Sequence, residues 1–248
     1  METIIFDDYN DLSVGTAEMI AELLVKKPDA LLCFPAGETS IGTFIHLINL
    51  YKAGKISFSQ CKIVGLDEWL HLGERRSENC YSFLRKHFFD NIDINETNLC
   101  FFNGESDDPE QECLKTDEFI QKNSPIDMIL LGVGMNGHLG LNEPGSLFSS
   151  YSHVVKLDEV TREVGQKYFQ NEVTLINGIT LGLKSIMEAK WVLLQMSGFR
   201  KAEIYQRFLN SEITPDFPIS ILKLHPNARF LMDHKAAGKN KREKGSCR

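Results

Sequence analysis

Hydrophobic positions along this chain follow two alternating patterns. Short apolar runs rich in β-branched residues predict buried strands, whereas longer stretches with apolar residues on one side predict helices. The predicted strands cover residues 3–6, 30–34, 62–66, 127–131, 191–196 and 229–232. The predicted helices lie between them, at residues 11–26, 41–53, 81–89, 110–121, 181–188 and 200–209. Because strands and helices alternate, the sequence predicts an α/β fold with a mainly parallel sheet.

The first predicted helix is expected to begin at Asp11, whose carboxylate can accept the free N–H groups of a first helical turn. One side of this helix is apolar and carries Val14, Met19, Ile20, Leu23 and Leu24. A helix with one apolar side packs that side against the core. We therefore expect this helix to cover one face of the sheet.

The two ends of the chain differ in character. Residues 1–234 carry the alternating pattern without an internal repeat or a low-complexity linker, so we expect a single α/β domain there. Residues 235–248 hold six Lys or Arg, one Glu and no apolar periodicity. This composition predicts a basic, disordered tail.

Composition and charge narrow the classes of partner. The 248 residues are 42% hydrophobic and 25% charged, as in ordinary globular proteins, and the net charge is −7. This charge argues against nucleic acid, because its phosphate backbone is bound by clustered Lys and Arg. A small anionic substrate needs only a few local cations. No apolar run approaches the roughly 20 residues that span a bilayer, so a membrane is not an expected partner either.

The N-terminal segment and the cysteines bear on the cellular compartment. The first residues lack the basic segment and apolar core of a signal peptide. The six cysteines are scattered without a C-x-x-C pair, which favours reduced, buried thiols over a disulfide framework or a zinc site. The sequence therefore predicts a cytoplasmic protein without a bound metal. It leaves the oligomeric state open, a homo-oligomer included.

Chemistry-bearing residues follow four of the predicted strands, and ligands of open parallel sheets bind beyond the carboxyl ends of strands. The first loop contains Gly37, Glu38, Thr39 and Ser40 at the start of a helix. Gly37 permits a tight turn, and Thr39 and Ser40 supply hydroxyl and backbone N–H groups that suit a phosphate. The spacing is not that of a Walker loop. A plain turn with a Ser or Thr cap explains this loop equally well on its own.

The second loop places Asp67 and Glu68 directly after a strand, between Leu66 and Trp69. Apolar neighbours shift the pKa of a carboxylate, and a shifted pKa suits proton abstraction. A helix cap with an ion pair is the alternative, and for an isolated pair of acids it is the favoured one.

The third loop, residues 132–146, contains a G-x-G-x-x-G pattern at Gly132, Gly134 and Gly137. A dinucleotide-binding fingerprint must open a helix, but two glycines and a proline further along break any helix here. The glycines are instead expected to let the backbone wrap closely around a ligand. The same loop contains His138 and Glu143, so the carboxylate can hold one ring nitrogen and leave the other free for proton transfer. This setting favours a functional histidine over a structural one.

The fourth loop leads into a helix whose first turn contains Lys201. A cation at this position opposes the helix dipole, and binding an anion would account for it. A solvated lysine is the alternative for the residue taken alone.

Taken together, these loops resemble the amino-sugar-phosphate deaminase family, which includes glucosamine-6-phosphate deaminase and galactosamine-6-phosphate deaminase/isomerase. The resemblance extends to about His234 and includes the segments at 53–58, 66–69, 136–145 and 224–226. Three segments are most similar to the galactosamine branch: 66–69 (Leu-Asp-Glu-Trp), 136–145 (Asn-Gly-His-Leu-Gly-Leu-Asn-Glu-Pro-Gly) and 178–184. The resemblance implies a three-layer α/β/α sandwich of Rossmann-like type, with residues 1–234 as the catalytic domain and no metal or organic cofactor.

The resemblance also implies a role for each motif. The loop of Gly37, Glu38, Thr39 and Ser40 would line a phosphate site, and positive charge would come from Lys201 and from Lys167, where the family usually has Arg.

The catalytic roles implied by the resemblance fall on the second and third loops. His138, oriented by Glu143, would open the pyranose ring, and Asp67 would take the C2 proton and return it to C1. Asn136 stands where glucosamine deaminases usually carry Asp, and a neutral amide can hydrogen-bond but cannot add charge beside His138.

The implied activity is isomerisation and deamination of a hexosamine 6-phosphate. Galactosamine 6-phosphate, giving tagatose 6-phosphate and ammonia, is the leading substrate, and glucosamine 6-phosphate, giving fructose 6-phosphate and ammonia, is the alternative. A 6-phosphogluconolactonase and a non-catalytic sensor of sugar phosphates are further alternatives. Neither of them needs a base at C2, so ammonia release separates both from the deaminases.

Overall fold

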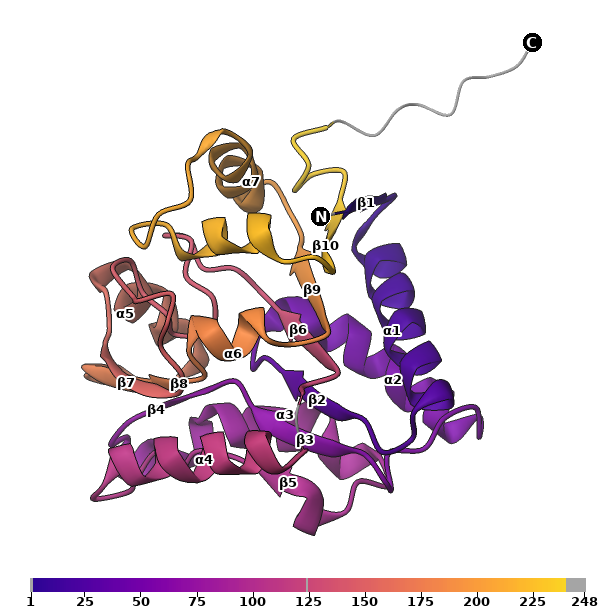
Figure 1. Cartoon of the computed structure of the whole chain (residues 1–248), viewed down its shortest axis with the longest axis horizontal. Helices are drawn as coiled ribbons and strands as arrows, with labels where there is room; N and C mark the ends of the chain where they lie inside the picture. Colours follow the sequence, from indigo (N-terminus) through magenta and orange to yellow (C-terminus); the bar gives the residue numbers. More distant parts are fainter. Residues whose placement is uncertain (1, 124, 240–248) are drawn as a thin grey trace.

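The structure, a computed structural model, describes residues 2–123 and 125–239. Its larger sheet consists of β1 Glu2–Phe6, β2 Leu31–Phe34, β3 Lys62–Gly65, β5 Leu99–Cys100, β6 Met128–Leu131, β9 Trp191–Met196 and β10 Ala228–Asp233. The strand order is β1-β10-β9-β6-β2-β3-β5, and all neighbouring strands run parallel (Figure 1). The predicted parallel α/β fold is confirmed. Within this larger sheet, only β5 was not predicted, because a strand of two residues has no hydrophobic pattern.

Six helices correspond to the predicted ones within a few residues: α1 Tyr9–Lys26, α2 Ile41–Lys52, α3 Cys80–His87, α4 Pro109–Asn123, α6 Leu183–Met187 and α7 Arg200–Asn210. A further helix, α5 Glu159–Gly165, was not predicted. Short 3₁₀ helices are η1 Glu38–Ser40, η2 Gly73–Glu78, η3 Phe89–Asn91, η4 Glu96–Asn98, η5 Gln166–Tyr168 and η6 Pro218–Leu224.

Helix α1 begins earlier than predicted. Its N-cap is Asp8, whose carboxylate accepts the backbone N–H groups of Asn10 and Asp11 at 3.0 and 3.1 Å. The prediction that Asp11 caps the helix is therefore wrong. Asp11 lies in the first turn, where its charge still interacts favourably with the helix dipole.

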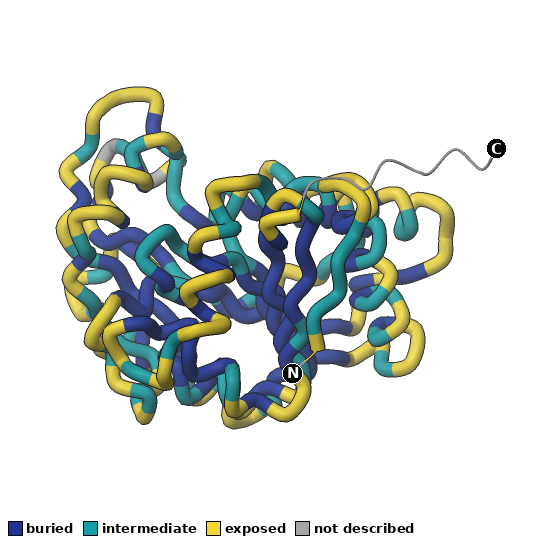
Figure 2. Tube along the Cα trace, turned by 90° about the horizontal axis from the view of Figure 1, so that it is seen from above, coloured by how far each residue is buried: buried dark blue, intermediate teal, exposed yellow. Residues whose placement is uncertain are grey.

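Alternating side chains of the central strands pack into two separate layers of helices. Leu31 and Cys33 face the cluster formed with α4, α6 and α7, whereas Leu32 and Phe34 face the cluster formed with α1, α2 and α3. This alternation follows from the two-residue period of a strand. Figure 2 shows the resulting buried centre, with exposed segments mostly at the periphery. The expected three-layer α/β/α sandwich is confirmed.

A second, antiparallel sheet stands beside the first one. It contains β4 Asp67–Trp69, β8 Asn177–Thr180 and β7 His153–Lys156 in the order β4-β8-β7. In Figure 1 this sheet lies on the opposite side of the molecule from α1 and α2. The sequence pattern did not predict it, because these strands of three or four residues are too short to alternate visibly. The sheet matters because Asp67 is its first residue in chain order.

The ordered chain extends past the predicted domain boundary at residue 234. Ala236 and Ala237 are buried, and the Ala236 N–H donates to the carboxylate of Asp233 at 2.7 Å. Ala236 and Ala237, which the sequence assigned to the tail, are thus packed on the fold. The rest of that predicted tail, 240–248, lies outside the described residues. No helix in the described part of the chain is long and apolar enough to cross a membrane.

Candidate active site

The four loops singled out in the sequence meet at one edge of the larger sheet. They follow β2, β3, β6 and β9, and these four strands are adjacent in the order β9-β6-β2-β3. The strands are parallel, so their carboxyl ends lie at the same edge. This is also the region where the direction of chain progression across the sheet reverses, the usual ligand position of open α/β folds.

The adjacent acids Asp67 and Glu68 have different surroundings. Glu68 is only 2% exposed, and its carboxylate accepts N–H groups from Trp69 at 2.8 Å, Cys80 at 2.9 Å and Tyr81 at 3.0 Å. Two of these donors lie in the first turn of α3, so Glu68 closes the start of that helix. The alternative of a helix cap therefore applies to Glu68 and leaves Asp67 for chemistry.

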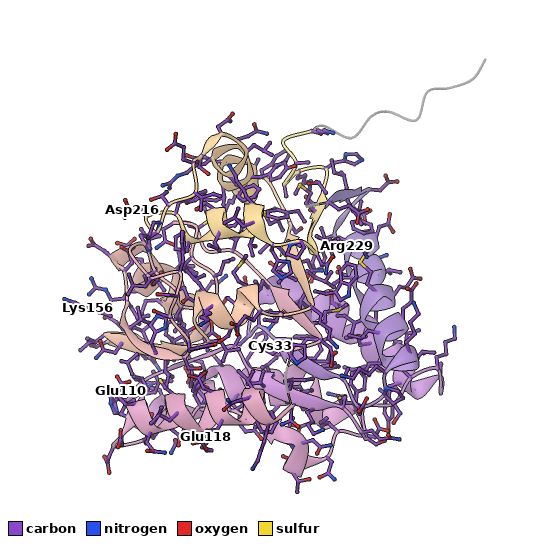
Figure 3. All side chains as sticks on the ribbon, in the orientation of Figure 1. Cys33, Glu110, Glu118, Lys156, Asp216 and Arg229 are labelled. Carbon is purple, nitrogen blue, oxygen red and sulfur yellow. The ribbon has the colours of Figure 1, made fainter. Side chains whose placement is uncertain are left out.

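Asp67 is a partly exposed carboxylate with a raised pKa. Loss of solvation in its buried setting and the negative charge of Glu68 raise the pKa of Asp67 to about 7, whereas the nearby His138 acts to lower it. Cys33, which Figure 3 labels near the centre of the molecule, feels the same carboxylate: burial and Asp67 raise its thiol pKa. A carboxylate with a pKa near neutrality is suited to act as a general base.

Two side chains contact His138 at its Nδ1 atom. The carboxylate of Glu143 lies 3.4 Å from Nδ1, and the hydroxyl of Thr161 lies 3.0 Å from it. The predicted contact between His138 and Glu143 is present. Nδ1 is thereby engaged, which leaves Nε2 for proton transfer.

Glu143 is the centre of this hydrogen-bonding network and is 5% exposed. Its Oε2 accepts from the Asn136 amide at 2.9 Å, and its Oε1 accepts from the Asp158 N–H at 3.2 Å. Burial acts to raise the pKa of Glu143, but hydrogen bonds and the His138 charge outweigh burial and lower it. Asn136 thus contacts the orienting carboxylate and, through Oδ1, the backbone N–H of His138 at 3.2 Å.

The glycine-rich loop contains no helix, as the sequence predicted. Gly134 is required by the histidine, because a Cβ atom there would stand 2.2 to 2.4 Å from three atoms of the His138 ring. Gly137 has a φ of +92°, and a Cβ there would be 2.3 Å from the Phe217 ring. We expected the glycines to let this loop wrap around a ligand, but at Gly134 the backbone lies against the His138 imidazole.

The loop at residues 37–40 forms η1 and leads into α2. Gly37 has extended backbone (φ −147°), so the tight turn expected of it is wrong; a Cβ there would meet nothing within 4 Å. The Ser40 hydroxyl donates inward to the Gly37 carbonyl at 2.6 Å. The Thr39 side chain makes no hydrogen bond within the described residues. The space beside Gly37 and the Thr39 hydroxyl is thus open to a ligand.

Two lysines bring positive charge to the site, Lys167 at this loop and Lys201 at the glycine-rich loop. Lys167 of η5 forms an ion pair of 2.7 Å with Glu38, and both side chains are largely exposed. Lys201, at the start of α7, donates to the Val133 carbonyl at 2.5 Å. Burial and the nearby charge of Lys167 lower the pKa of Lys201 to about 8. The charge of Lys167 therefore reaches Lys201.

The phenol of Tyr168 is affected by two carboxylates of the site, Glu38 and Asp67. Burial raises the pKa of its phenol most, and the charges of Glu38 and Asp67 raise it further. Both carboxylates therefore lie near one side chain. Sequence reasoning missed Tyr168 and Thr161, because both belong to the short elements α5 and η5. The one available signal was Asp158, a helix N-cap that accepts the Val160 N–H at 2.9 Å.

Metal ligands are not grouped in the part of the chain that the structure describes: no three His, Cys, Asp or Glu side chains there could hold an ion together. The functional groups gathered at the sheet edge are a carboxylate, an oriented imidazole, two ammonium groups and backbone N–H groups.

Comparison with known proteins places this chain in a family. Residues 9–231 match the family described as glucosamine-6-phosphate isomerases/6-phosphogluconolactonase. A glucosamine-6-phosphate deaminase of Bacillus pumilus is 41% identical over 237 residues, which cover 95% of this chain and 98% of that protein. One from Clostridium botulinum is 36% identical over 242 residues, or 97% of this chain and 99% of the relative.

Solved structures agree with this placement. A monomeric glucosamine-6-phosphate deaminase, described as a missing link of the NagB superfamily, superposes with a TM-score of 0.92 at 35% identity, covering 97% of this chain and 100% of that one. A 6-phosphogluconolactonase from Trypanosoma brucei shares the fold at a TM-score of 0.75 and 16% identity, covering 96% and 97% of the two chains. The chain belongs to the glucosamine-6-phosphate isomerase/6-phosphogluconolactonase family and is an enzyme.

Proposed function

We propose that this enzyme isomerises and deaminates glucosamine 6-phosphate, giving fructose 6-phosphate and ammonia. The observation that carries the proposal is the placement of Asp67, with a pKa of about 7, beside an oriented His138 and near the lysine-bearing loop. A base for the C2 proton distinguishes a deaminase from a lactonase, because opening a lactone requires no carbon acid to be deprotonated.

The proposed chemistry begins with ring opening. His138 Nε2 transfers a proton between the C1 hydroxyl and the ring oxygen, while Glu143 and Thr161 hold the opposite nitrogen. Asp67 then removes the C2 proton of the open aldose, and a proton passes from the C2 ammonium group to O1, which gives an enolamine and a protonated Asp67. Return of that proton to C1 produces an iminium at C2, which water hydrolyses with release of ammonia.

The phosphate of the substrate would occupy the open space beside Gly37, where Thr39 and the start of α2 offer hydrogen-bond donors. Lys201 and Lys167 would neutralise its charge, and each would exchange its present partner, Val133 or Glu38, for a phosphate oxygen. This exchange fixes the sugar with C2 toward Asp67.

The choice of hexosamine rests on the relatives. The proteins that match over nearly the whole chain at 35 to 41% identity are named for glucosamine 6-phosphate. The resemblance of residues 66–69 and 136–145 to the galactosamine branch supports the C4 epimer as a second candidate.

An ammonia-release assay over matched substrates tests the proposal. Glucosamine 6-phosphate and galactosamine 6-phosphate would be compared by kcat/KM, with 6-phosphogluconolactone hydrolysis as a third arm. We expect ammonia release, fastest with glucosamine 6-phosphate. A higher kcat/KM for galactosamine 6-phosphate would transfer the assignment to that substrate. Lactone hydrolysis without ammonia release, or binding without turnover, would reject a deaminase.

A further inference from the structure

Thr161 lies where helix α5 meets the imidazole of His138. Its side chain is 5% exposed, and its hydroxyl is 3.0 Å from His138 Nδ1. The nearest carboxylate oxygen of Glu143 is 3.4 Å from the same nitrogen. The ring nitrogen thus faces a carboxylate oxygen and a hydroxyl group, and the hydroxyl is the closer one. A distance of 3.0 Å is typical of a good hydrogen bond, whereas 3.4 Å is long for one.

The hydrogen-bonding chemistry of His138, Thr161 and Glu143 indicates where the protons between them lie. A carboxylate only accepts hydrogen bonds, whereas a hydroxyl can accept one and donate one. Hydrogen bonds from His138, Thr161 and Asn136 lower the pKa of Glu143 against the effect of burial, so this carboxylate is charged. All three groups are satisfied when Thr161 donates its proton to Glu143 and presents a lone pair to a proton on Nδ1. This order leaves His138 Nε2 without a proton.

We propose that Thr161 is a positioning residue that connects His138 to Glu143 and holds the imidazole in the tautomer protonated on Nδ1. Its consequence for catalysis rests on the proposed function, since Nε2 is the atom that serves ring opening there. The charged groups that face His138 in that arrangement are Glu143 from the glycine-rich loop and Asp67 from β4.

Thr161 is fixed by the packing of the segment to which it belongs. The Asp158 N–H, at the start of α5, donates to Glu143 Oε1 at 3.2 Å. At the end of α5, Gly165 lies against the indole of Trp69, where an added Cβ would be 3.3 Å from the ring. Leu157, Phe169 and Leu175 join Trp69 in one buried cluster. The tautomer of the histidine thus depends on α5 resting against β4.

Two variants separate the hydroxyl from the packing of the side chain. Thr161→Val keeps the branched shape and removes the hydroxyl, whereas Thr161→Ser keeps the hydroxyl and removes a methyl group. Because a hydrogen bond that serves a charged pair is lost in the first variant only, kcat should fall about tenfold in Thr161→Val with KM unchanged, and should stay within about threefold in Thr161→Ser. Equal losses in both variants would show that Thr161 serves packing.

Two further comparisons guard against a folding effect. Val164→Thr makes the reverse exchange at a half-exposed position of the same helix and should leave kcat unchanged. In a Glu143→Gln background, Thr161→Val should cost much less than in the wild type, because both residues act on one nitrogen. Additive losses in the double variant would contradict the proposed connection.

A measurement without substrate tests the tautomer itself. In ¹⁵N spectra of the free protein, Nδ1 of His138 should carry the proton in the wild type and in Thr161→Ser, and this proton should exchange slowly with water. In Thr161→Val the exchange should become at least about tenfold faster, since the nearest acceptor is gone. A proton on Nε2 in the wild type, or unchanged exchange in Thr161→Val, would overturn the proposal. Absence of ammonia release by the wild type would refute the proposed function and leave this result standing.

Discussion

The two sides of the candidate site are held by different kinds of contact. The proposed catalytic side is formed by Asp67, His138 and Glu143. Glu143 is 5% exposed there and accepts hydrogen bonds from the Asn136 amide and the Asp158 N–H. On the phosphate side, formed by the loop at 37–40 with Lys167 and Lys201, the Glu38 and Lys167 side chains are 62% and 43% exposed.

We infer from this difference that the proposed catalytic side is preorganised, whereas the proposed phosphate side exchanges its contacts when substrate binds. Under the proposed function we expect Glu143 to keep its partners during turnover, because they hold the carboxylate that contacts the imidazole. Lys167 and Lys201 hold partners that a phosphate can replace, namely the Glu38 carboxylate and the Val133 carbonyl. Changes on the catalytic side should therefore lower kcat, and changes on the phosphate side should alter KM.

The largest effect is expected from Asp67→Asn, which keeps the shape of the side chain and removes the proton acceptor. Turnover and the exchange of the C2 proton with solvent should both fall by about 10²-fold or more, while substrate binding persists. Glu68→Gln is the matched comparison: it disturbs a carboxylate that accepts three backbone N–H groups, so it should lower the melting temperature. Near-normal exchange in Asp67→Asn would remove Asp67 from its role.

A smaller effect, confined to binding, is expected from Lys201→Met. The variant preserves the length of the side chain and removes a charged hydrogen bond to the phosphate, so KM should rise about 30-fold with little change in kcat. Lys184→Met is the control, because Lys184 is partly exposed and forms an ion pair of 3.9 Å with Glu188. A fall in kcat at unchanged KM would contradict the division between the two sides.

The pH dependence of kcat/KM should reflect both sides of the site. Asp67 must be unprotonated to act as a base, so activity should rise with pH through its pKa of about 7. Lys201 must be protonated to bind the phosphate, so activity should fall above its pKa of about 8. One pH unit beyond either limit should cost about tenfold. Lys201→Arg, which stays charged, should move only the alkaline limb upward, and a fixed alkaline limb would contradict this assignment.

The smallest effect is expected from Glu38→Gln. Removing this carboxylate frees Lys167 and takes a negative charge away from the phosphate loop, so KM should fall about threefold at low salt. The gain should fade at high salt, since the pair is exposed. Glu188→Gln, which changes a surface ion pair elsewhere, serves as the control. A rise in KM would mean that the Glu38 carboxylate contributes to substrate binding.

The larger sheet was predictable from the sequence because its strands are apolar runs that recur between amphipathic helices. The smaller sheet was not, since a strand such as Asp67–Trp69 is three residues long and continues directly from the loop after β3. Its antiparallel partner supplies no local signal either. The position of each acid on this second sheet nevertheless decides that Glu68 closes the start of α3 and that Asp67 faces the site.

The chemistry of the site was predictable where one loop contained both partners. His138 and Glu143 are five residues apart in the sequence, and the structure joins them at 3.4 Å. Thr161 and the pairing of Lys167 with Glu38 depend on contacts across 23 and 129 residues, which no spacing rule reveals. Gly134 was assigned to ligand wrapping, although its absent side chain makes room for the imidazole.

The most direct test of the account compares glucosamine 6-phosphate with unphosphorylated glucosamine in an ammonia-release assay of the wild-type enzyme. Both sugars offer the same C2 proton to Asp67, but only the first can engage Lys167 and Lys201. The account predicts that kcat/KM falls by at least about 10²-fold when the phosphate is absent, because the charged contacts that position C2 are then lost. Equal kcat/KM for the two sugars would contradict the claim that the two sides of the site serve one substrate.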